Sequence, residues 1–140
     1  MAFIPVCEPM LAGNELKYVT EAVSTGWISS SGKFVNEFER QFAEYCGCKY
    51  GIAVCNGTIA LHLALIGLGI GPGDEVILPT FTMIASAFAV CYTGAKPVFV
   101  DADSKTWNID VTKIEEKITS QLGRKLCPYH TSFQKYVLAL

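Results

Sequence analysis

The chain has 140 residues, of which 51% are hydrophobic and 17% are charged, and its formal net charge is −2 at pH 7. This length predicts about one domain, long enough to enclose a core. The small negative charge does not favour binding to nucleic acid or to an anionic membrane. The longest strongly apolar run, residues 52–70, has polar residues near its start, so we expect a buried strand and helix there rather than a membrane span.

Two apolar stripes at helical spacing precede residue 50. The first stripe predicts a helix that ends before Gly26, and the second predicts a helix that Gly47 closes. The stripes consist of Leu16, Val19 and Val23, and of Val35, Phe38, Phe42 and Tyr45.

Strands and helices alternate in the rest of the chain. We expect strand 50–55, helix 57–68, strand 75–79, helix 82–92, strand 97–100 and helix 111–118. Strands this apolar suit a sheet that is covered on both faces, and the strand–helix–strand order implies parallel crossovers. The sequence therefore predicts an α/β fold with a mostly parallel sheet, helices on both faces, and strands near 51–54, 75–78 and 97–100 in one sheet.

The segment Asn56-Gly57-Thr58 joins an expected strand directly to an expected helix. The first amides of a helix have no intrahelical acceptor, and the helix dipole places partial positive charge at the same end. Gly57 lets a phosphate approach the backbone, and Thr58 adds a hydroxyl donor. The alternative is that these residues only turn the chain and cap the helix.

Four segments occur in an order and spacing that resemble a known family: 24–32, 50–66, 69–82 and 94–101. Over about residues 4–119 the chain resembles the amino-terminal part of the pyridoxal-phosphate-dependent sugar aminotransferases, which include perosamine synthases and antibiotic-sugar aminotransferases. The resemblance implies the large domain of the aspartate-aminotransferase fold (fold type I). It also implies a cytoplasmic homodimer that transfers an amino group from an amino acid to a nucleotide-linked keto-sugar in polysaccharide biosynthesis.

The resemblance implies cofactor-binding roles for four residues. Gly57 and Thr58 correspond to the cup for the phosphate of pyridoxal phosphate. Met83 aligns with an aromatic residue that covers the cofactor ring, a role open to a polarizable sulfur, and Phe81 is a less favoured substitute. An alternative for Met83 is a position in the core of a helix.

A serine-rich loop follows the first expected helix. By resemblance, Trp27, Ser29 and Ser30, with Ser31, border the sugar-nucleotide pocket near the dimer interface. The alternative is an ordinary serine-rich turn.

The resemblance places the lysine that bonds the cofactor, and the carboxylate that protonates its ring nitrogen, beyond the matched segments. None of the chain's lysines has the sequence context of that lysine, His62 is expected to pack rather than react, and we assign no catalytic residue. We therefore expect the 140 residues alone to be inactive. A sugar dehydratase of the same family, in which histidine replaces the lysine, and a non-catalytic truncated product remain alternatives.

Residues 120–140 differ in composition from the rest of the chain. They contain Arg124, Lys125 and Lys135 but no acidic residue, and the family pattern stops there. We expect 1–119 to be part of the large domain and 120–140 to be a divergent tail of the kind that a frameshift leaves.

The chain has six cysteines, at positions 7, 46, 48, 55, 91 and 127, which could form three bridges, but a cytosolic protein is preferred. Four of them lie inside or beside expected helices and strands, where a free cysteine is often buried. Cys46 and Cys48 form the only close pair, and no second pair at zinc-site spacing accompanies them, so no metal site is expected. The amino terminus shows no signal-peptide pattern.

Overall fold

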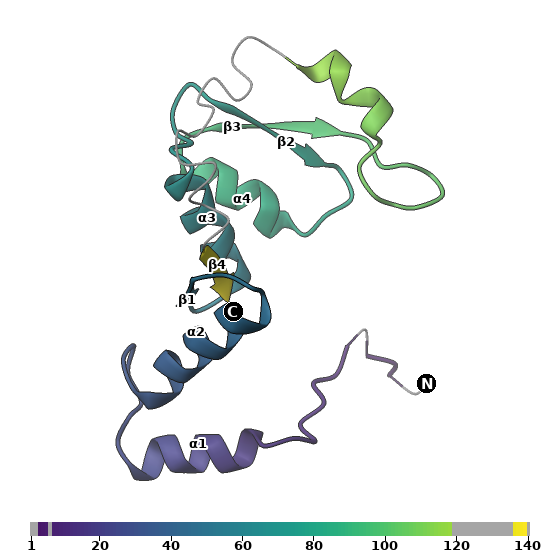
Figure 1. Ribbon diagram of the computed structural model, residues 1–140. Helices are drawn as coiled ribbons and strands as arrows, with labels where there is room; N and C mark the ends of the chain where they lie inside the picture. Colours follow the sequence, from purple (N-terminus) through teal and green to yellow (C-terminus); the bar gives the residue numbers. More distant parts are fainter. Residues whose placement is uncertain (1–2, 6, 119–135, 140) are drawn as a thin grey trace. The chain divides into compact units, whose positions relative to one another are not determined.

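A computed structural model describes residues 3–5, 7–118 and 136–139 (Figure 1). The chain divides into two compact units, Met1–Phe38 and Glu39–Leu140. Each unit is described by itself.

The first unit contains α1 (Glu15–Ser24) and the beginning of α2 (Lys33–Tyr45), which continues into the second unit. Both helices were expected from their apolar stripes. Lys33 Nζ lies 2.7 Å from Glu21 Oε1, and the rings of Tyr18 and Phe34 lie 5.4 Å apart, so both contacts join α1 to the start of α2. No residue of α1 is buried.

The predicted glycine at the end of α2 takes the conformation that this role requires. Gly47 has φ +67°, its amide donates to the carbonyl of Glu44, and the amide of Cys48 donates to the carbonyl of Ala43. This is the Schellman arrangement, in which a left-handed residue turns the chain back onto the last carbonyls of the helix. The same pair of hydrogen bonds ends α1 at Gly26 and α3 at Gly69.

The second unit follows the predicted alternation of strands and helices. Its elements are β1 (Tyr50–Ala53), α3 (Gly57–Gly67), β2 (Glu75–Pro79), α4 (Ile84–Tyr92), β3 (Lys96–Val100), the 3-10 helices η1 (Val111–Lys113) and η2 (Glu115–Lys117), and β4 (Tyr136–Ala139). The helix expected over 111–118 is therefore two 3-10 turns, each closed by hydrogen bonds between residues three apart. Val111 and Ile114 are three residues apart, a spacing that fits either kind of helix, so this pair does not distinguish the two.

The strand pairings are parallel, as predicted, but they form two sheets rather than one. β2 pairs with β3 in the register Val76 to Pro97, and β1 pairs with β4 in the register Gly51 to Val137. The expectation that β1, β2 and β3 share a sheet is wrong for this structure, because β1 has β4 as its described neighbour. The α/β class with parallel pairing and helices is confirmed.

The core of the second unit is built from small side chains. Helix α4 contacts α3, β2 and β3, and it contributes Ala87, Ala89 and Val90, of which the last two are 1% exposed. Val100 of β3 is equally buried. Alanines at a helix contact let the backbones approach closely, so α4 lies near its neighbours.

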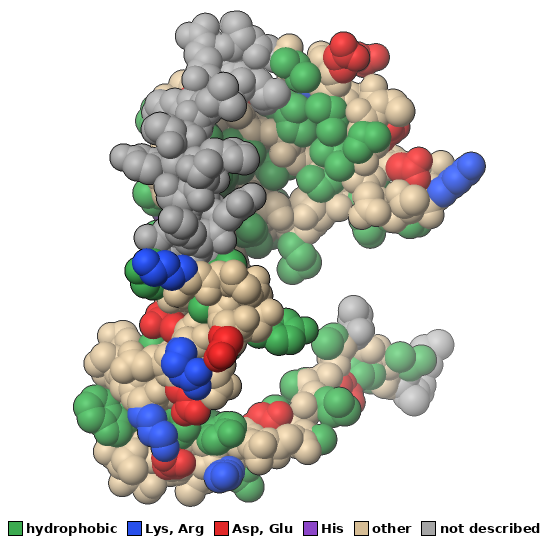
Figure 2. Space-filling view, in the orientation of Figure 1, with side chains coloured by type: hydrophobic (Ala, Val, Ile, Leu, Met, Phe, Trp, Pro, Cys, Tyr) green, Lys and Arg blue, Asp and Glu red, His purple; other side chains and the backbone are tan. Residues whose placement is uncertain are grey.

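Many large apolar side chains nevertheless lie at the surface (Figure 2). Leu16 is 81% exposed, Tyr45 is 88% exposed and Ile66 is 52% exposed. None of the helices in the described part of the chain has the length and apolar character needed to cross a membrane.

The cysteines differ from expectation. Cys7, Cys46, Cys55 and Cys91 are exposed thiols, and Cys48 is half-buried. Cys46 and Cys55 lie beside helix and strand ends, whereas Cys91 lies within α4 and Cys7 precedes α1. Cys127 lies outside the described residues. Within residues 3–5, 7–118 and 136–139, no three His, Cys, Asp or Glu side chains are grouped so as to hold a metal ion.

Candidate cofactor-binding site

The turn between β1 and α3 is shaped by Asn56. Its backbone is extended, its Oδ1 accepts a 3.0 Å hydrogen bond from the amide of Ile59, and its carbonyl accepts from the amide of Ala60. Asn56 Nδ2 also donates to Cys55 Sγ at 3.5 Å. Both the oxygen and the nitrogen of the Asn56 side chain are therefore hydrogen-bonded. The helix begins at Gly57, as predicted.

This cap leaves two amides of α3 available. Gly57 and Thr58 occupy the first two helical positions, and no acceptor for their N–H groups is found among the described residues. Both amides lie at the positive end of an eleven-residue helix. This combination of donors and dipole suits an anion such as a phosphate.

Phe81 and Met83 follow the carboxyl end of β2. Met83 precedes the first residue of α4 and is 77% exposed, so the alternative interpretation of Met83 as a helix-core residue is wrong. Phe81 is 64% exposed, and its ring lies 5.2 Å from that of Trp107. Both side chains are accessible, and their roles against a cofactor ring remain predictions.

Trp27, Ser29 and Ser30 belong to the first unit and are exposed. The amide of Trp27 closes α1 through the carbonyl of Ala22, and its side chain lies against Gly32, where an added Cβ would be 3.3 Å from the indole. The structure thus shows an ordered turn after α1. The role of these three residues at a sugar-nucleotide pocket remains a prediction.

His62 lies on α3, one turn after Thr58. Its ring lies 5.6 Å from that of Tyr92 of α4 in a T-shaped arrangement, and its Nε2 is buried without a hydrogen-bond partner among the described residues. This placement agrees with a packing role at the contact between α3 and α4.

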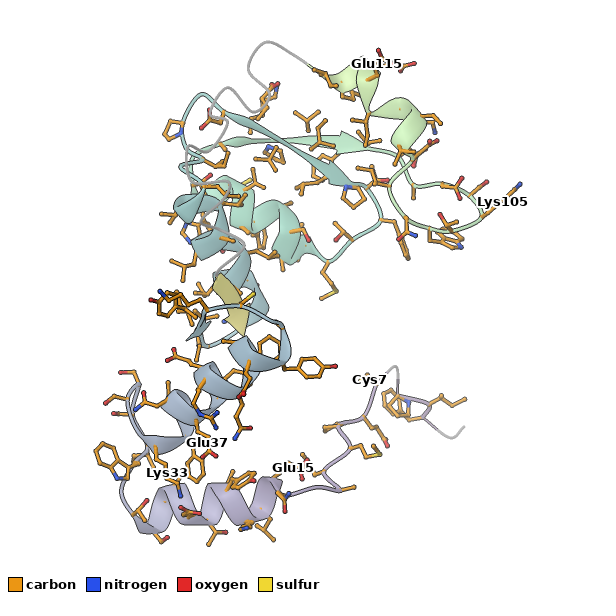
Figure 3. All side chains as sticks on the ribbon, viewed as in Figure 1. Cys7, Glu15, Lys33, Glu37, Lys105 and Glu115 are labelled. Atoms are coloured by element: carbon orange, nitrogen blue, oxygen red, sulfur yellow. The ribbon has the colours of Figure 1, made fainter. Side chains whose placement is uncertain are left out.

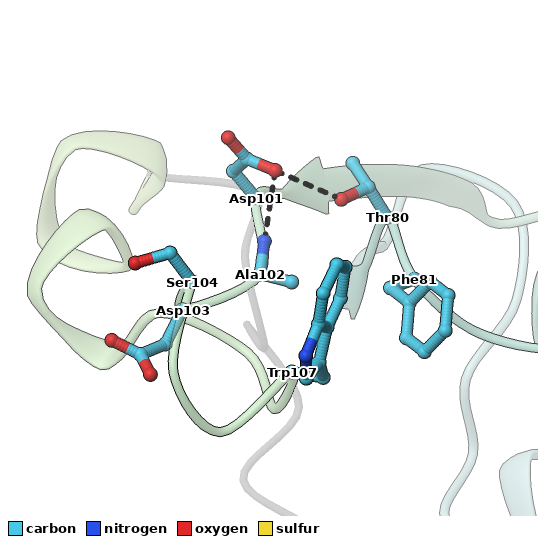
Figure 4. Close-up of a pocket in the computed structure, with 7 residues that line it drawn as sticks. All are labelled: Thr80, Phe81, Asp101, Ala102, Asp103, Ser104 and Trp107. Atoms are coloured by element: carbon cyan, nitrogen blue, oxygen red, sulfur yellow. Dashed lines mark hydrogen bonds between the residues drawn. The ribbon is translucent and has the colours of Figure 1, made fainter.

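The sequence reasoning missed a cavity at the carboxyl ends of β2 and β3. Its loop, 102–109, is closed by an antiparallel bridge between Ala102 and Ile109, and Lys105 extends from its tip (Figure 3). The cavity has a volume of about 360 Å³ (Figure 4), and its lining consists of Thr80, Phe81, Asp101, Ala102, Asp103, Ser104 and Trp107. Ligands in open α/β sheets bind beyond such strand ends, so the sequence indicates the place, at residues 79–82 and 101–103, but neither the cavity nor the position of Trp107 in its lining.

Both carboxylates of this cavity are stabilised in their charged form. The amide of Ala102, the nearby Lys113 and the hydroxyl of Thr80 lower the pKa of Asp101. The amide and hydroxyl of Thr106 lower the pKa of Asp103, with the amide of Lys105. Each shift arises mainly from donors that favour a carboxylate over a carboxylic acid.

Comparison with known proteins identifies the family. Residues 9–131 match the DegT/DnrJ/EryC1/StrS aminotransferase family. The chain belongs to this family. The predicted family is thereby confirmed, and the match runs past residue 119, where the resemblance was expected to end. The expected tail falls mostly outside the described residues, so the boundary at 119 remains a prediction.

Two curated relatives illustrate the relationship. The chain is 55% identical over 127 residues to GDP-perosamine synthase from Caulobacter vibrioides, covering 91% of this chain and 34% of the relative. It is 51% identical over 127 residues to GDP-perosamine synthase from Escherichia coli O157:H7, covering 91% of this chain and 35% of the relative. The chain therefore spans about a third of the length of these relatives.

Solved structures agree in fold. A putative sugar aminotransferase, Spr1654 from Streptococcus pneumoniae in its PMP form, has a TM-score of 0.77 at 32% identity, over 94% of this chain and 35% of that chain. NtdA from Bacillus subtilis with bound PMP has a TM-score of 0.70 at 39% identity, over 76% of this chain and 24% of that chain. The family is pyridoxal-phosphate-dependent, as the resemblance implied.

Proposed function

We propose that this chain supplies the phosphate-binding part of a pyridoxal-phosphate-dependent aminotransferase that acts on nucleotide-linked keto-sugars with an amino acid as donor. The observation that carries the proposal is the pair of amides of Gly57 and Thr58, at the amino terminus of α3 in a chain of this family, which have no acceptor among the described residues. The names of its relatives support the sugar substrate.

The residues at this turn fit a phosphate group. The two amides and the Thr58 hydroxyl provide three donors for a ligand. The amide of Ile59 already donates to Asn56, so it is not available to the same ligand. Hydrogen bonds to a charged acceptor are roughly twice as strong as neutral ones, which suits a phosphate dianion. When bound, pyridoxal phosphate supplies an electron sink for transfer of the amino group.

Other residues would orient the ring and the sugar. Met83 or Phe81, both exposed after β2, would cover one face of the cofactor ring. Trp27, Ser29 and Ser30 would border the sugar nucleotide. We assign no proton-transfer role to any of the 140 residues.

The proposal includes a cytoplasmic homodimer. Its support is an apolar stripe on α1, where Leu16, Val19 and Val23 are 81%, 60% and 65% exposed. Exposed apolar side chains gathered on one helix face are typical of interaction surfaces. The free thiols of Cys7, Cys46, Cys55 and Cys91 agree with a reducing compartment.

The proposed activity is tested with a chimaera. This chain replaces the matching third of GDP-perosamine synthase from Escherichia coli O157:H7, and formation of GDP-perosamine is measured. Thr58→Val removes the hydroxyl donor, and we expect cofactor retention to fall about 3- to 10-fold, as for the loss of one hydrogen bond. Thr20→Val, an equivalent change on the exposed surface of α1, is the control.

A second measurement does not depend on assembly of the chimaera. Inorganic phosphate added to the isotope-labelled chain should shift the amide signals of Gly57 and Thr58, and chloride at equal ionic strength should not. The proposal fails if Thr58→Val and Thr20→Val chimaeras retain the cofactor equally and phosphate moves neither amide signal.

A further inference from the structure

The cavity at the carboxyl ends of β2 and β3 combines two aromatic rings with two carboxylates (Figure 4). None of its residues belongs to the turn that holds Gly57 and Thr58. Its volume of about 360 Å³ lies within the range of small-molecule sites, roughly 300–1,000 Å³. It shares Phe81 with the residues proposed to cover the cofactor ring, and it is a candidate for a second ligand.

Two neighbouring aromatic rings form one side of the cavity. Phe81 and Trp107 lie 5.2 Å apart with an angle of 51° between their ring planes. Trp107 has φ +60°, and its amide donates to the carbonyl of Asp103 at 2.9 Å. The two rings are 64% and 61% exposed, so their faces are uncovered.

The acidic side is only partly used by the protein. Asp103 Oδ1 accepts hydrogen bonds from the amides of Lys105 and Thr106 and from the Thr106 hydroxyl, whereas its Oδ2 has no partner among the described residues. Asp101 Oδ1 accepts from the amide of Ala102 and from Thr80 Oγ1.

The nearby cations leave net negative charge at the cavity. Lys113 Nζ lies 3.6 Å from Asp101 Oδ2 and 3.4 Å from Asp110 Oδ2, and Lys113 is not part of the lining. Lys105 extends away from the loop (Figure 3). Two carboxylates thus line the cavity without a lysine or arginine among the lining residues.

We propose that this cavity binds a small organic cation that carries an ammonium group. Aromatic faces attract such cations through the ring quadrupole, and the carboxylates neutralise their charge. The hydroxyls of Thr80 and Ser104 add donors and acceptors for a polar substituent. Anions are disfavoured by the two carboxylates.

The rings are exposed, so the interaction is weak, with dissociation constants in the millimolar range. At this affinity, the dissociation constants of a cation and of a neutral molecule of the same shape can still be distinguished. Choline and 3,3-dimethyl-1-butanol are such a pair, because the second replaces the charged nitrogen of the first with carbon.

The chain has two tryptophans, so Trp27→Phe leaves Trp107 as the only indole reporter. In this background, choline chloride at constant ionic strength should change the emission of Trp107 saturably. We expect choline to bind about tenfold more tightly than 3,3-dimethyl-1-butanol. An equal response to the two molecules, or no saturable response to choline in the millimolar range, would overturn the proposal.

Two variants locate the binding site. Asp103→Asn keeps an oxygen acceptor for the turn but removes the charge, and Phe81→Leu removes the second ring; each should weaken choline binding several-fold. Asp110→Asn is the matched control, because Asp110 also accepts from a neighbouring amide and hydroxyl, those of Thr112, but does not line the cavity.

Circular dichroism of each variant verifies the fold, and amide shifts at Ala102 and Ser104 provide a reading that does not depend on fluorescence. Equal affinity in Asp103→Asn and Asp110→Asn would contradict the assignment.

Discussion

The Oδ1 atom of Asn56 and the amide of Ile59 form a 3.0 Å hydrogen bond that closes the amino terminus of α3. Asn14 stands at the equivalent position of α1, but within the described part of the chain its side chain makes no such hydrogen bond. The chain therefore contains two asparagines at the same helical position, of which one caps its helix and the other does not.

Asn56→Ala should lower the free energy of unfolding by about 1 kcal/mol, because it leaves the amide of Ile59 without an acceptor. Asn14→Ala should change it by less than about 0.5 kcal/mol, as for a surface substitution. Urea unfolding of both variants, with hydrogen exchange at the Ile59 amide, checks this difference. Similar losses in the two variants would show that the side-chain bond of Asn56 does not stabilise the helix.

Gly51 of β1 lies against the backbone of α2. A Cβ added at Gly51 would stand 2.4 Å from the carbonyl oxygen of Glu39, an atom that cannot rotate away, whereas a Cβ at Gly71 would meet its nearest neighbour at 3.7 Å. Gly51→Ala should therefore destabilise the second unit by about 1–3 kcal/mol, the usual cost of overpacking. Gly71→Ala should leave the stability nearly unchanged. Thermal unfolding of the two variants checks which of them is less stable.

Local elements could be predicted because their causes are local. Asn56 fixes the start of α3, and Gly47 the end of α2, through contacts within five residues along the chain. Strand partners are different, since β1 and β4 are separated by more than eighty residues and nothing in either strand specifies the other. Pairing depends on the packing of the whole unit, which the sequence pattern does not reveal.

The backbone conformation of the candidate site could be predicted from the sequence. The strand-to-helix turn at Gly57 and Thr58 follows from the apolar run and its capping residue. The cavity was missed because Trp107 is left-handed, a conformation that sequence rules assign to glycine or asparagine. The apolar run of β3 also gives no sign that the following loop folds back to bring Trp107 against Phe81.

Trp107 offers a direct test of that backbone conformation. At φ +60°, a residue with a Cβ is strained by about 1 kcal/mol or more, and glycine is not. Trp107→Gly should therefore be more stable than Trp107→Ala by about 1 kcal/mol, since both lose the contact with Phe81. The backbone of Lys105 is not left-handed, so Lys105→Ala should be more stable than Lys105→Gly.

The loop that follows β3 should weaken in acid. The pKa values of Asp101, Asp103 and Asp110 are lowered by hydrogen bonds from neighbouring groups, so their stabilising contribution is fully present above the unfolded-state pKa of about 4. It is lost as the pH falls through the lower folded-state values. Carboxyl NMR titration should give three midpoints below that of an unfolded aspartate. The urea concentration at the midpoint of unfolding should decrease as the pH is lowered from about 5 to about 2. Midpoints at the ordinary value would contradict the hydrogen bonding seen at Asp103.

The 140 residues alone should not transfer an amino group, because no lysine described in the structure is suited to bond the cofactor. Such a lysine must be partly deprotonated and held in a desolvated pocket. All seven described lysines are exposed, and carboxylate neighbours raise the pKa of Lys33 and Lys113, which keeps them protonated. The phosphate cup alone gains only about 0.3–2 kcal/mol from the helix dipole, too little to retain the cofactor. The purified chain is incubated with pyridoxal phosphate, reduced with borohydride and mapped by peptide mass, and amino transfer to a nucleotide keto-sugar is assayed in parallel. We expect scattered substoichiometric labelling and no product, whereas one stoichiometric adduct at a single lysine, with transfer, would show that these residues contain a catalytic lysine.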